Sequence, residues 1–340
     1  MFTFNEPDFY SNLLHGRMDS QLTKVSYNRF VDGCKSQNRG VYEHVLVMDS
    51  VQTMFTINFL ENNHRYENRV YRYHFLYDNC ATRIRDLMLQ TLGSITLPES
   101  HEAPPTYRNM IHHHLKSYPW RKFIIDIIAG LPVDQKIGVF EQMFLPNCMS
   151  KIFASSLFQG QPIVKETINI FVPSQPSIQF QSFFSPTIAC CLVLVFALFF
   201  SYARKMAIYF DFLLFFSVGI VGLLVFYLWF FTNHSTMVNN LNIIWALPTH
   251  LVMAFFLIFK RHRDFTRKYF LGTAIVSLLL IASWVFLPQH LNPALIPLVL
   301  AIALRGGLIG KFTFNAVFSV ICNIFHFSVF KKYIHVSHKK

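Results

Sequence analysis

The sequence predicts a two-part protein, in which a mixed α+β domain of about 180 residues precedes an all-α transmembrane bundle of five or six helices. Two observations predict this division. The first half interleaves short apolar and polar segments and holds 16 of the 18 acidic residues, whereas the second half consists of long, nearly uncharged apolar runs. The 53% hydrophobic content and the mean hydropathy of +0.34 therefore average a globular domain and a membrane domain.

The first half shows the periodicities of short helices and strands. The predicted helices are Asp8–Arg17, Val25–Gly33, Ser50–Asn62, Ala81–Leu92 and Tyr118–Gly130, and the predicted strands are Val41–Met48 and Arg69–Tyr77. Composition predicts a domain over residues 1–171, a linker rich in Pro, Ser and Gln over 172–185, a transmembrane domain over 186–310 and a basic tail over 311–340.

Five apolar runs in the second half are long enough, or nearly so, to cross a bilayer, which takes about 20 helical residues. They are Pro186–Tyr202, Ile208–Phe231, Leu241–Phe259, Tyr269–Leu287 and a run from Leu291 past Leu304 toward Gly310. A sixth, Phe312–Phe330, contains Asn and His and is compatible with either an interfacial helix or a span. Asp211 and His250 lie near span ends, where we expect them to reach the interface.

Basic residues alternate between the predicted loops, and this alternation orients the spans. Arg204 and Lys205 follow the first span and five basic residues follow the third, whereas the second and fourth loops hold none. Arg305 and the tail are basic again. The positive-inside rule places these basic segments in the cytoplasm and residues 1–180 outside it. The net charge of +12 is thus a topology signal and not the footprint of a nucleic-acid partner.

An exported first half needs a translocation signal, and Met1–Tyr10 has the pattern of neither a signal peptide nor a signal anchor. We therefore expect Met1 to be an internal methionine of a longer chain that has an upstream hydrophobic leader.

The segment Tyr71–Met88 carries the main chemical signal. Its first half alternates aromatic and other residues like a strand, and its second half is a helix closed by Gly93. Asp78 and Asn79 are N-cap candidates, which places Cys80 in the first helical turn. Helix N-termini stabilise thiolates, so Cys80 is a candidate nucleophile. The alternative is a small buried cysteine beside a helix cap.

The other cysteines and the histidine cluster predict neither a disulfide framework nor a metal site. The chain has no CxxC, and the sequence leaves open whether Cys34 and Cys148 pair. Adjacent helical residues point in different directions, so His112–His114 is a poor chelator. No metal and no cofactor are predicted.

Two segments, Asp78–Asp86 (DNCATRIRD) and Asn233–Trp245 (NHSTMVNNLNIIW), are the most distinctive stretches of the chain. The first resembles the core of the Lnb N-terminal periplasmic domain, a bacterial family. The resemblance continues through Phe4–Asp19, Asn38–Met48, Tyr118–Asp134, Glu141–Asn147, Thr232–Leu251 and Leu287–Leu298, and so covers most of the chain to about Leu304.

The resemblance implies a lipoprotein N-acyltransferase of the bacterial inner (cytoplasmic) membrane, with membrane phospholipids and exported lipoproteins as its partners. It also implies a permuted papain-like fold related to NlpC/P60, in which Cys80 matches the nucleophile. The family's base histidine belongs to a Gly-His-Thr stretch that precedes the part matching Phe2–Phe9. The resemblance therefore implies a domain incomplete at its N-terminus, and His44, in a later strand, does not match that base.

Several residues near Cys80 are candidates for catalysis or substrate binding. Backbone N–H groups at Cys80 and Ala81 could stabilise an oxyanion. Arg83 and Arg85 are candidate ligands of a lipid phosphate, or else exposed helix arginines. Asp78 could orient the base, although capping the helix is its simpler role, and His74 is a minor candidate for a substitute base.

The loop after the second span is a second candidate substrate site. His234, Asn239 and Asn240 cluster at the outer membrane boundary between Trp229 and Trp245, where a lipid-using enzyme needs contacts to head groups. The simpler interpretation is a solvated loop.

Three other functions remain open on the sequence alone. A membrane-tethered cysteine hydrolase would use water as the acceptor, and five spans argue against it. A catalytically inactive membrane protein would lack the base altogether. A transporter is disfavoured, because the spans show almost no charge that could line a path.

Overall fold

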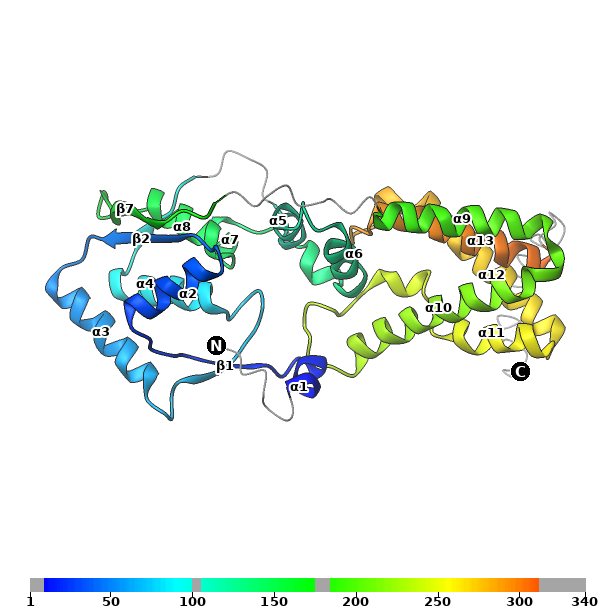
Figure 1. Cartoon of the computed structure of the whole chain (residues 1–340), viewed down its shortest axis with the longest axis horizontal. Coiled ribbons are helices and arrows are strands. Elements are labelled where there is room, and N and C mark those ends of the chain that lie inside the picture. The colour runs from blue at the N-terminus through cyan, green and yellow to red at the C-terminus, as the bar shows by residue number, and fades with distance from the viewer. Residues whose placement is uncertain (1–8, 100–104, 175–183, 312–340) are drawn as a thin grey trace, which may run out of the picture. The chain divides into compact units, whose positions relative to one another are not determined.

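The computed structural model describes residues 9–99, 105–174 and 184–311, and Figure 1 shows the arrangement of the elements. The chain divides into two compact units, each of which draws on both halves of the sequence. The first unit comprises residues 1–117, 132–182 and 231–236, and the second comprises 118–131, 183–230 and 237–340. A helix from the first half thus belongs to the membrane unit, and a loop from the second half belongs to the first unit.

The first unit combines seven helices with seven strands among its described residues. The helices are α1 (Phe9–His15), α2 (Tyr27–Ser36), α3 (Ser50–His64), α4 (Cys80–Leu92), α5 (Tyr107–His114), α7 (Val139–Gln142) and α8 (Pro146–Ser155). The strands are β1 (Asp19–Gln21), β2 (Val41–Leu46), β3 (Val70–Arg72), β4 (Ile95–Thr96), β5 (Leu157–Phe158), β6 (Gln161–Pro162) and β7 (Val164–Phe171). Every helix predicted in this half is present, with α2 starting two residues later than expected, and the strand at Val41 is confirmed.

The strands of the first unit form three small antiparallel sheets, with orders β1-β3, β2-β7 and β4-β5-β6. The longest pairing joins β2 to β7, which lies more than 100 residues further along the chain. An α+β first unit is therefore confirmed. The papain-like arrangement implied by the resemblance stays a prediction.

The core of the first unit is built on α4. Met88 and Leu92, four residues apart on one face of α4, pack with Met143, Phe153 and Ile163, and all five are nearly fully buried. Burying such a side chain contributes roughly 1.5–3 kcal/mol, so this cluster fixes α4 in the unit.

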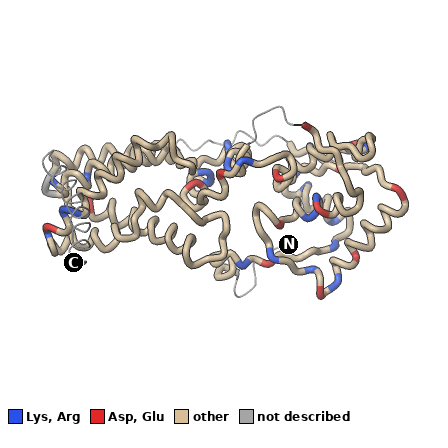
Figure 2. The backbone as a smooth tube through the Cα atoms, turned by 180° about the vertical axis from the view of Figure 1, so that it is seen from behind, with Lys and Arg blue, Asp and Glu red and all other residues tan. Residues whose placement is uncertain are grey.

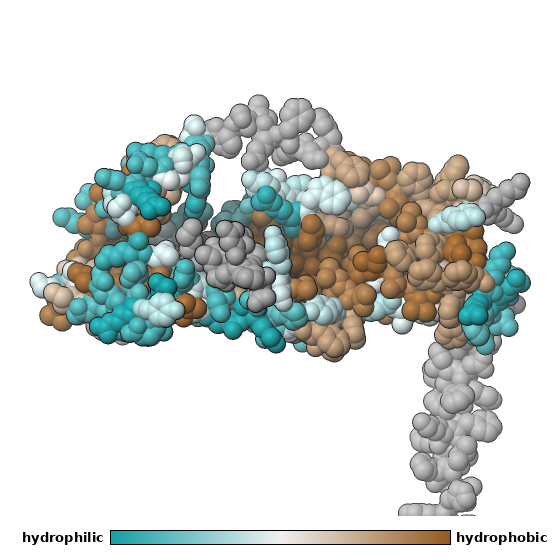
Figure 3. Space-filling model, turned by 60° about the horizontal axis from the view of Figure 1, so that its bottom comes forward, coloured by the Kyte–Doolittle hydropathy of each residue, from teal (hydrophilic) through white to brown (hydrophobic). Residues whose placement is uncertain are grey.

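The second unit is helical. Its elements are α6 (Pro119–Ile128), α9 (Pro186–Tyr202), α10 (Arg204–Phe230), η2 (Leu241–Ile244), α11 (Thr249–Phe259), α12 (Arg263–Ala282), η3 (Trp284–Phe286), η4 (Pro293–Leu295) and α13 (Ile296–Gly310). Within residues 184–311, which the structure describes, four stretches are long and apolar enough to span a membrane, and α9 is a shorter apolar helix of 17 residues. All five apolar runs predicted for this region are helical, and Phe312–Phe330 lies outside the described residues. Figure 3 shows hydrophobic side chains covering the visible face of these helices.

Charges are interspersed over the first unit and sparse along the membrane helices, as Figure 2 shows. The expectation that Asp211 and His250 reach the membrane interface is wrong for both residues. Asp211 is buried and forms an ion pair with Arg305, with Oδ1 2.6 Å from Nε, so neither residue reaches the interface. His250 is also fully buried, with its Nδ1 2.7 Å from the Tyr269 hydroxyl. The bundle interior therefore holds polar groups that the apolar sequence pattern did not reveal.

Candidate active site around Cys80

The segment before Cys80 is a tight turn and not the strand predicted over Arg69–Tyr77. Strand β3 ends at Arg72, and the backbones of His74 and Asp78 then pair with each other, with N–O distances of 2.8 and 3.1 Å. Nδ1 of His74 accepts hydrogen bonds from the N–H groups of Leu76 and Tyr77 inside this turn. These local bonds replace the strand ladder. As a consequence, Leu76 is buried, whereas Phe75 and Tyr77, members of the expected aromatic face, are half exposed.

Asn79, and not Asp78, caps α4. Its Oδ1 accepts from Ala81 N–H at 2.8 Å and from Thr82 N–H at 3.0 Å, while Thr82 Oγ1 accepts from the Asn79 N–H. Cys80 is therefore the first residue of α4, and its thiol is exposed. The alternative prediction, a small buried cysteine beside the cap, is wrong, because Cys80 is exposed to solvent.

The capping bonds leave only one of the two predicted oxyanion donors, Cys80 N–H and Ala81 N–H, without a capping partner. The Ala81 N–H is already donated to Asn79, so it is not available to an oxyanion. The N–H of Cys80 lies outside the capping bonds at the positive end of the helix dipole, where a developing negative charge is stabilised.

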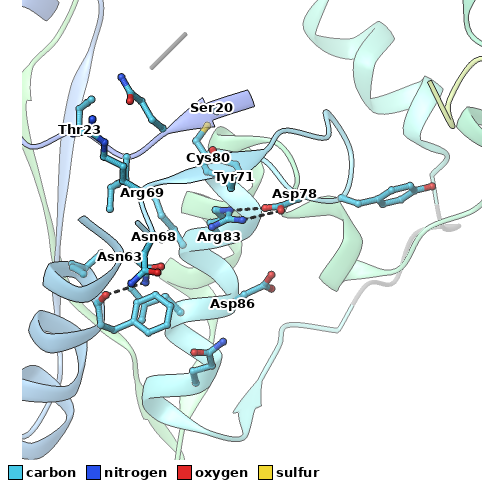
Figure 4. A pocket seen from close by; sticks show the side chains of 18 residues that line it. Ser20, Thr23, Asn63, Asn68, Arg69, Tyr71, Asp78, Cys80, Arg83 and Asp86 are labelled. Carbon is cyan, nitrogen blue, oxygen red and sulfur yellow. Dashed lines mark hydrogen bonds and ion pairs between the residues drawn. The ribbon is translucent and has the colours of Figure 1, made fainter. Parts of the chain in front are cut away.

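Cys80 opens onto a pocket of about 670 Å³ between β1, α3 and α4 (Figure 4). One part of the lining is polar and the other is apolar. The polar residues include Ser20, Gln21, Thr23, Asn63, Asn68, Arg69 and Gln90, and the apolar ones include Leu22, Phe59, Leu60, Ile84 and Leu87. Such a lining suits an amphiphilic molecule with a polar head and a hydrocarbon chain.

The two arginines predicted as phosphate ligands are both engaged by carboxylates. Arg83 lines the pocket, but its Nε and one terminal nitrogen bind the two Asp78 oxygens at 2.7 and 3.0 Å. Its guanidinium also lies over the Tyr71 ring, 3.6 Å from the centroid. Arg85 is buried beneath Phe140 and pairs with Asp86, so it is neither exposed nor part of the pocket lining.

His74 is held by contacts that conflict with its service as the base. Because Nδ1 accepts two backbone hydrogen bonds, Nε2 carries the proton and donates to Ser235 Oγ at 2.7 Å. Burial lowers the pKa of His74, the Asp78 carboxylate opposes that shift, and His234 adds to it. None of the described residues that line the pocket is a histidine.

Tyr73 is a polar neighbour of Cys80 that the sequence did not single out. Burial, and in second place the negative charge of the Cys80 thiolate, raises the pKa of Tyr73 to about 12. The phenol therefore stays protonated at neutral pH.

The outer loop after α10 is divided between the two units. In the first unit, His234 Nε2 lies 3.0 Å from the Leu13 carbonyl and its ring packs against Gly16, while Ser235 bonds His74. This part of the loop therefore supports the turn that leads to Cys80. Asn239 is exposed and lies in the second unit.

Asn240, in contrast, is fully buried in the second unit. Its Nδ2 donates to the carbonyls of Ile127 and Ile128 at the end of α6, at 2.8 and 3.1 Å. Asn242 and Gln289 make similar bonds to the carbonyls of Asp126 and Ala129. These contacts give Asn240 a structural role in holding α6, and a substrate role for it stays a prediction.

The described residues contain no group of three or more His, Cys, Asp or Glu side chains placed to hold a metal ion. Cys34 and Cys148, whose pairing the sequence left open, are both free thiols.

Comparison with protein families agrees with both parts of this architecture. Residues 3–113 match the model of the Lnb N-terminal periplasmic domain, and residues 178–316 match the model of the Lnb transmembrane domain. Comparison with curated proteins and with solved structures gives no match. The two matches follow one another along the chain as the resemblance predicted. The chain therefore belongs to the Lnb family of membrane proteins, which carry a periplasmic domain at the N-terminal side of the membrane helices.

Proposed function

We propose that this protein is a lipoprotein N-acyltransferase, in which Cys80 carries an acyl chain from a membrane phospholipid to the amino-terminal cysteine of an exported lipoprotein. The observation that carries this proposal is the exposed Cys80 thiol at the first position of α4, opening onto an amphiphilic pocket. The proposed location of the protein is the bacterial inner membrane, with the first unit on the periplasmic side.

The reaction takes two steps that each conserve atoms and charge. The Cys80 thiolate attacks the ester carbonyl carbon of the lipid, a C–S bond forms, and the lysolipid alkoxide leaves and takes up a proton. The neutral amine of the lipoprotein then attacks the thioester, a C–N bond forms, the proton goes to a base and Cys80 is released as a thiolate.

The surroundings of Cys80 assist the first step. The dipole of α4 favours negative charge at the helix start, and the Cys80 N–H, which makes none of the capping bonds, is a backbone donor there. The Asp78–Arg83 pair holds the rim of the pocket, so we assign Asp78 a positioning role there.

A thioester-trapping experiment tests the proposal. The detergent-purified chain is incubated with a phospholipid that carries a mass-labelled acyl chain, and the Cys80 peptide is analysed by mass spectrometry. We expect the mass of one acyl group on Cys80, its removal by hydroxylamine, and its loss in Cys80→Ala. The matched control is Cys148→Ala, which removes the partly buried thiol of the same unit and should leave the label unchanged.

Addition of a synthetic diacylglyceryl-cysteine peptide should then move the label to the peptide amine, and the same peptide with an acetylated amine should receive nothing. Release of free fatty acid in place of transfer would identify a hydrolase and contradict the proposal.

A catalytically inactive membrane protein is the second candidate. Two observations favour it: His74 has both ring nitrogens engaged, and no described residue of the pocket lining is a histidine. Its signature would be a Cys80 that reacts with iodoacetamide no faster than Cys148 and that forms no thioester.

A further inference from the structure

We infer that Arg69 forms an anion-binding subsite of the Cys80 pocket, which takes the phosphodiester of a glycerophospholipid. This inference rests on the proposed function, since it names the part of the acyl donor that the pocket recognises. Arg83 and Arg85 were the candidate phosphate ligands in the sequence, and the structure shows both paired with carboxylates within the protein.

The free charge of the pocket belongs to Arg69. The described lining residues carry four charges: Arg69, Arg83, Asp78 and Asp86. Arg83 pairs with Asp78, and Asp86 pairs with Arg85 behind the pocket wall. Arg69 therefore contributes a positive charge that no carboxylate among the described residues neutralises.

The hydrogen bonding of Arg69 points the same way. Its Nε is buried and has no hydrogen-bond partner among the described residues. Buried donors without a partner are rare in folded proteins, and each needs an explanation. A bound anion supplies one, because the planar guanidinium fork matches two oxygens of a phosphate group.

The backbone and the Tyr66 ring hold Arg69 in place without a hydrogen bond from its Nε. The Arg69 carbonyl accepts from Leu22 N–H at 2.8 Å, which extends the β1–β3 pairing, and its own N–H bonds the Arg65 carbonyl at 3.0 Å. The guanidinium lies over the Tyr66 ring, 4.8 Å from the centroid, so the ring covers one of its faces. Such a side chain is preorganised for an anion.

The rest of the lining selects a lipid phosphate over a soluble one. The hydroxyl and amide groups of Thr23, Asn63 and Asn68 line the pocket together with Arg69, as Figure 4 shows. Leu60 and Ile84 provide apolar surface from α3 and α4, where it can cover an acyl chain. An inorganic phosphate would use only the polar part of the pocket.

The test measures binding, so it does not depend on acyl transfer. The full chain with Cys80→Ser is titrated with dihexanoyl phosphatidylglycerol in an uncharged detergent, and the dissociation constant is determined by native mass spectrometry. Dihexanoylglycerol, which lacks the phosphate, and inorganic phosphate are titrated in parallel. Arg69→Gln should weaken phosphatidylglycerol binding by about tenfold to a hundredfold, which is the range for a hydrogen bond to a charged group.

The matched control is Arg65→Gln, because Arg65 is an exposed arginine of the same loop and does not line the pocket. It should leave the dissociation constant unchanged. If Arg69→Gln unfolds the unit, Arg69→Lys replaces it: the charge remains but the planar fork is lost, so we expect a weakening of several-fold in a folded protein.

Equal affinities of wild type, Arg69→Gln and Arg69→Lys would overturn the inference, as would equal binding of dihexanoylglycerol. Inorganic phosphate that binds as tightly as phosphatidylglycerol would make this a site for free phosphate and would also overturn it. If Cys80 forms no thioester while lipid binding still depends on Arg69, the proposed function fails and the subsite stands.

Discussion

The side-chain amide of Asn79 donates to the carbonyl oxygen of Phe144 at 3.0 Å, although Phe144 lies 65 residues further along the chain. The same amide donates to the Phe75 carbonyl at 2.7 Å, while Oδ1 caps α4. One buried side chain thus joins the turn before Cys80, the first turn of α4 and the segment between α7 and α8. The position of Cys80 at the start of α4 therefore depends on this single side chain.

Replacing Asn79 by Ala should destabilise the first unit by about 2–3 kcal/mol, because the change removes a helix cap and leaves the buried Phe144 carbonyl without its donor. Chemical denaturation monitored by far-ultraviolet circular dichroism measures this loss of stability. Asp49→Ala is the matched control, since Asp49 caps the exposed helix α3 and makes a capping bond only. A loss no larger for Asn79→Ala than for Asp49→Ala would contradict the bridging role.

Asn79→Asp separates position from charge. Aspartate retains the capping oxygen but adds a negative charge next to Cys80 and removes the two donated bonds. We expect iodoacetamide alkylation of Cys80 at neutral pH to slow about tenfold relative to wild type, because the added negative charge disfavours the reactive thiolate. Alkylation of Asn79→Asp at the wild-type rate would show that the helix start does not control the thiol.

Local sequence signals predicted the elements around the site well. Gly93, with φ of +77°, ends α4 as the sequence indicated, and Asp49 and Gln52 form the capping box at the start of α3. These features depend on residues only a few positions apart, so periodicity and capping preferences are sufficient to find them.

The predictions that failed did so because of specific side-chain pairings, most of them local and one long-range, that periodicity does not reveal. The alternation through Tyr77 predicted a strand. The His74 ring instead accepts hydrogen bonds from two backbone N–H groups of a turn, and its other nitrogen bonds Ser235, which lies 161 residues further along the chain. The sequence did not single out Arg69, because a missing partner leaves no local pattern. Arg83 and Arg85 pair with Asp78 and Asp86, whereas the Arg69 Nε has no partner among the described residues.

The turn before Cys80 should loosen at acidic pH. Burial lowers the pKa of His74 below 6.5, so the unfolded turn binds more protons than the folded one between that lowered pKa and 6.5. The stabilisation by neutral His74 is therefore complete above pH 6.5 and declines as the pH falls. Protonation of Nδ1 also removes its acceptance of the Leu76 and Tyr77 N–H groups.

Hydrogen–deuterium exchange measures this effect at the Leu76 and Tyr77 amides. After correction for the intrinsic rate, exchange should accelerate when the pH falls from 7.5 to about 5.5. In His74→Asn, exchange should be fast at both pH values. Ser235→Ala should accelerate exchange at both values but keep the pH dependence, since Nδ1 is unchanged. Protection that is independent of pH in the wild type would exclude His74 as the titrating group.

The buried pair Asp211–Arg305 should behave as a unit within the membrane helices. Both side chains are less than a tenth exposed, and Arg305 also lies 3.2 Å from the Ser201 hydroxyl of α9. Arg305→Leu leaves a buried carboxylate without a partner and should cost about 3–5 kcal/mol. The double variant Asp211→Leu/Arg305→Leu removes both charges and should recover most of that loss, as read from thermal unfolding midpoints in detergent. Additive losses from the two single changes would contradict a direct pairing.

Gly130, which follows the end of α6, should not tolerate replacement by a residue with a Cβ atom. A Cβ there would lie 1.9 Å from the carbonyl oxygen of Val238, and that oxygen belongs to rigid backbone. The buried amide of Asn240 bonds the carbonyls two and three residues before Gly130, so the two segments cannot separate without breaking those bonds. Gly130→Ala should therefore destabilise the second unit by about 3 kcal/mol or more.

Gly272→Ala is the matched control for Gly130→Ala, because no atom lies within 4 Å of the Cβ position in the middle of α12 and alanine favours a helix. Its unfolding midpoint in detergent should equal or slightly exceed that of the wild type. Limited proteolysis of Gly130→Ala should also cut within residues 118–131, whereas the wild type should resist cleavage there. If Gly130→Ala unfolds at the wild-type temperature and stays protected, α6 is not held against the 238–242 segment in the way that the Asn240 and Asn242 bonds require.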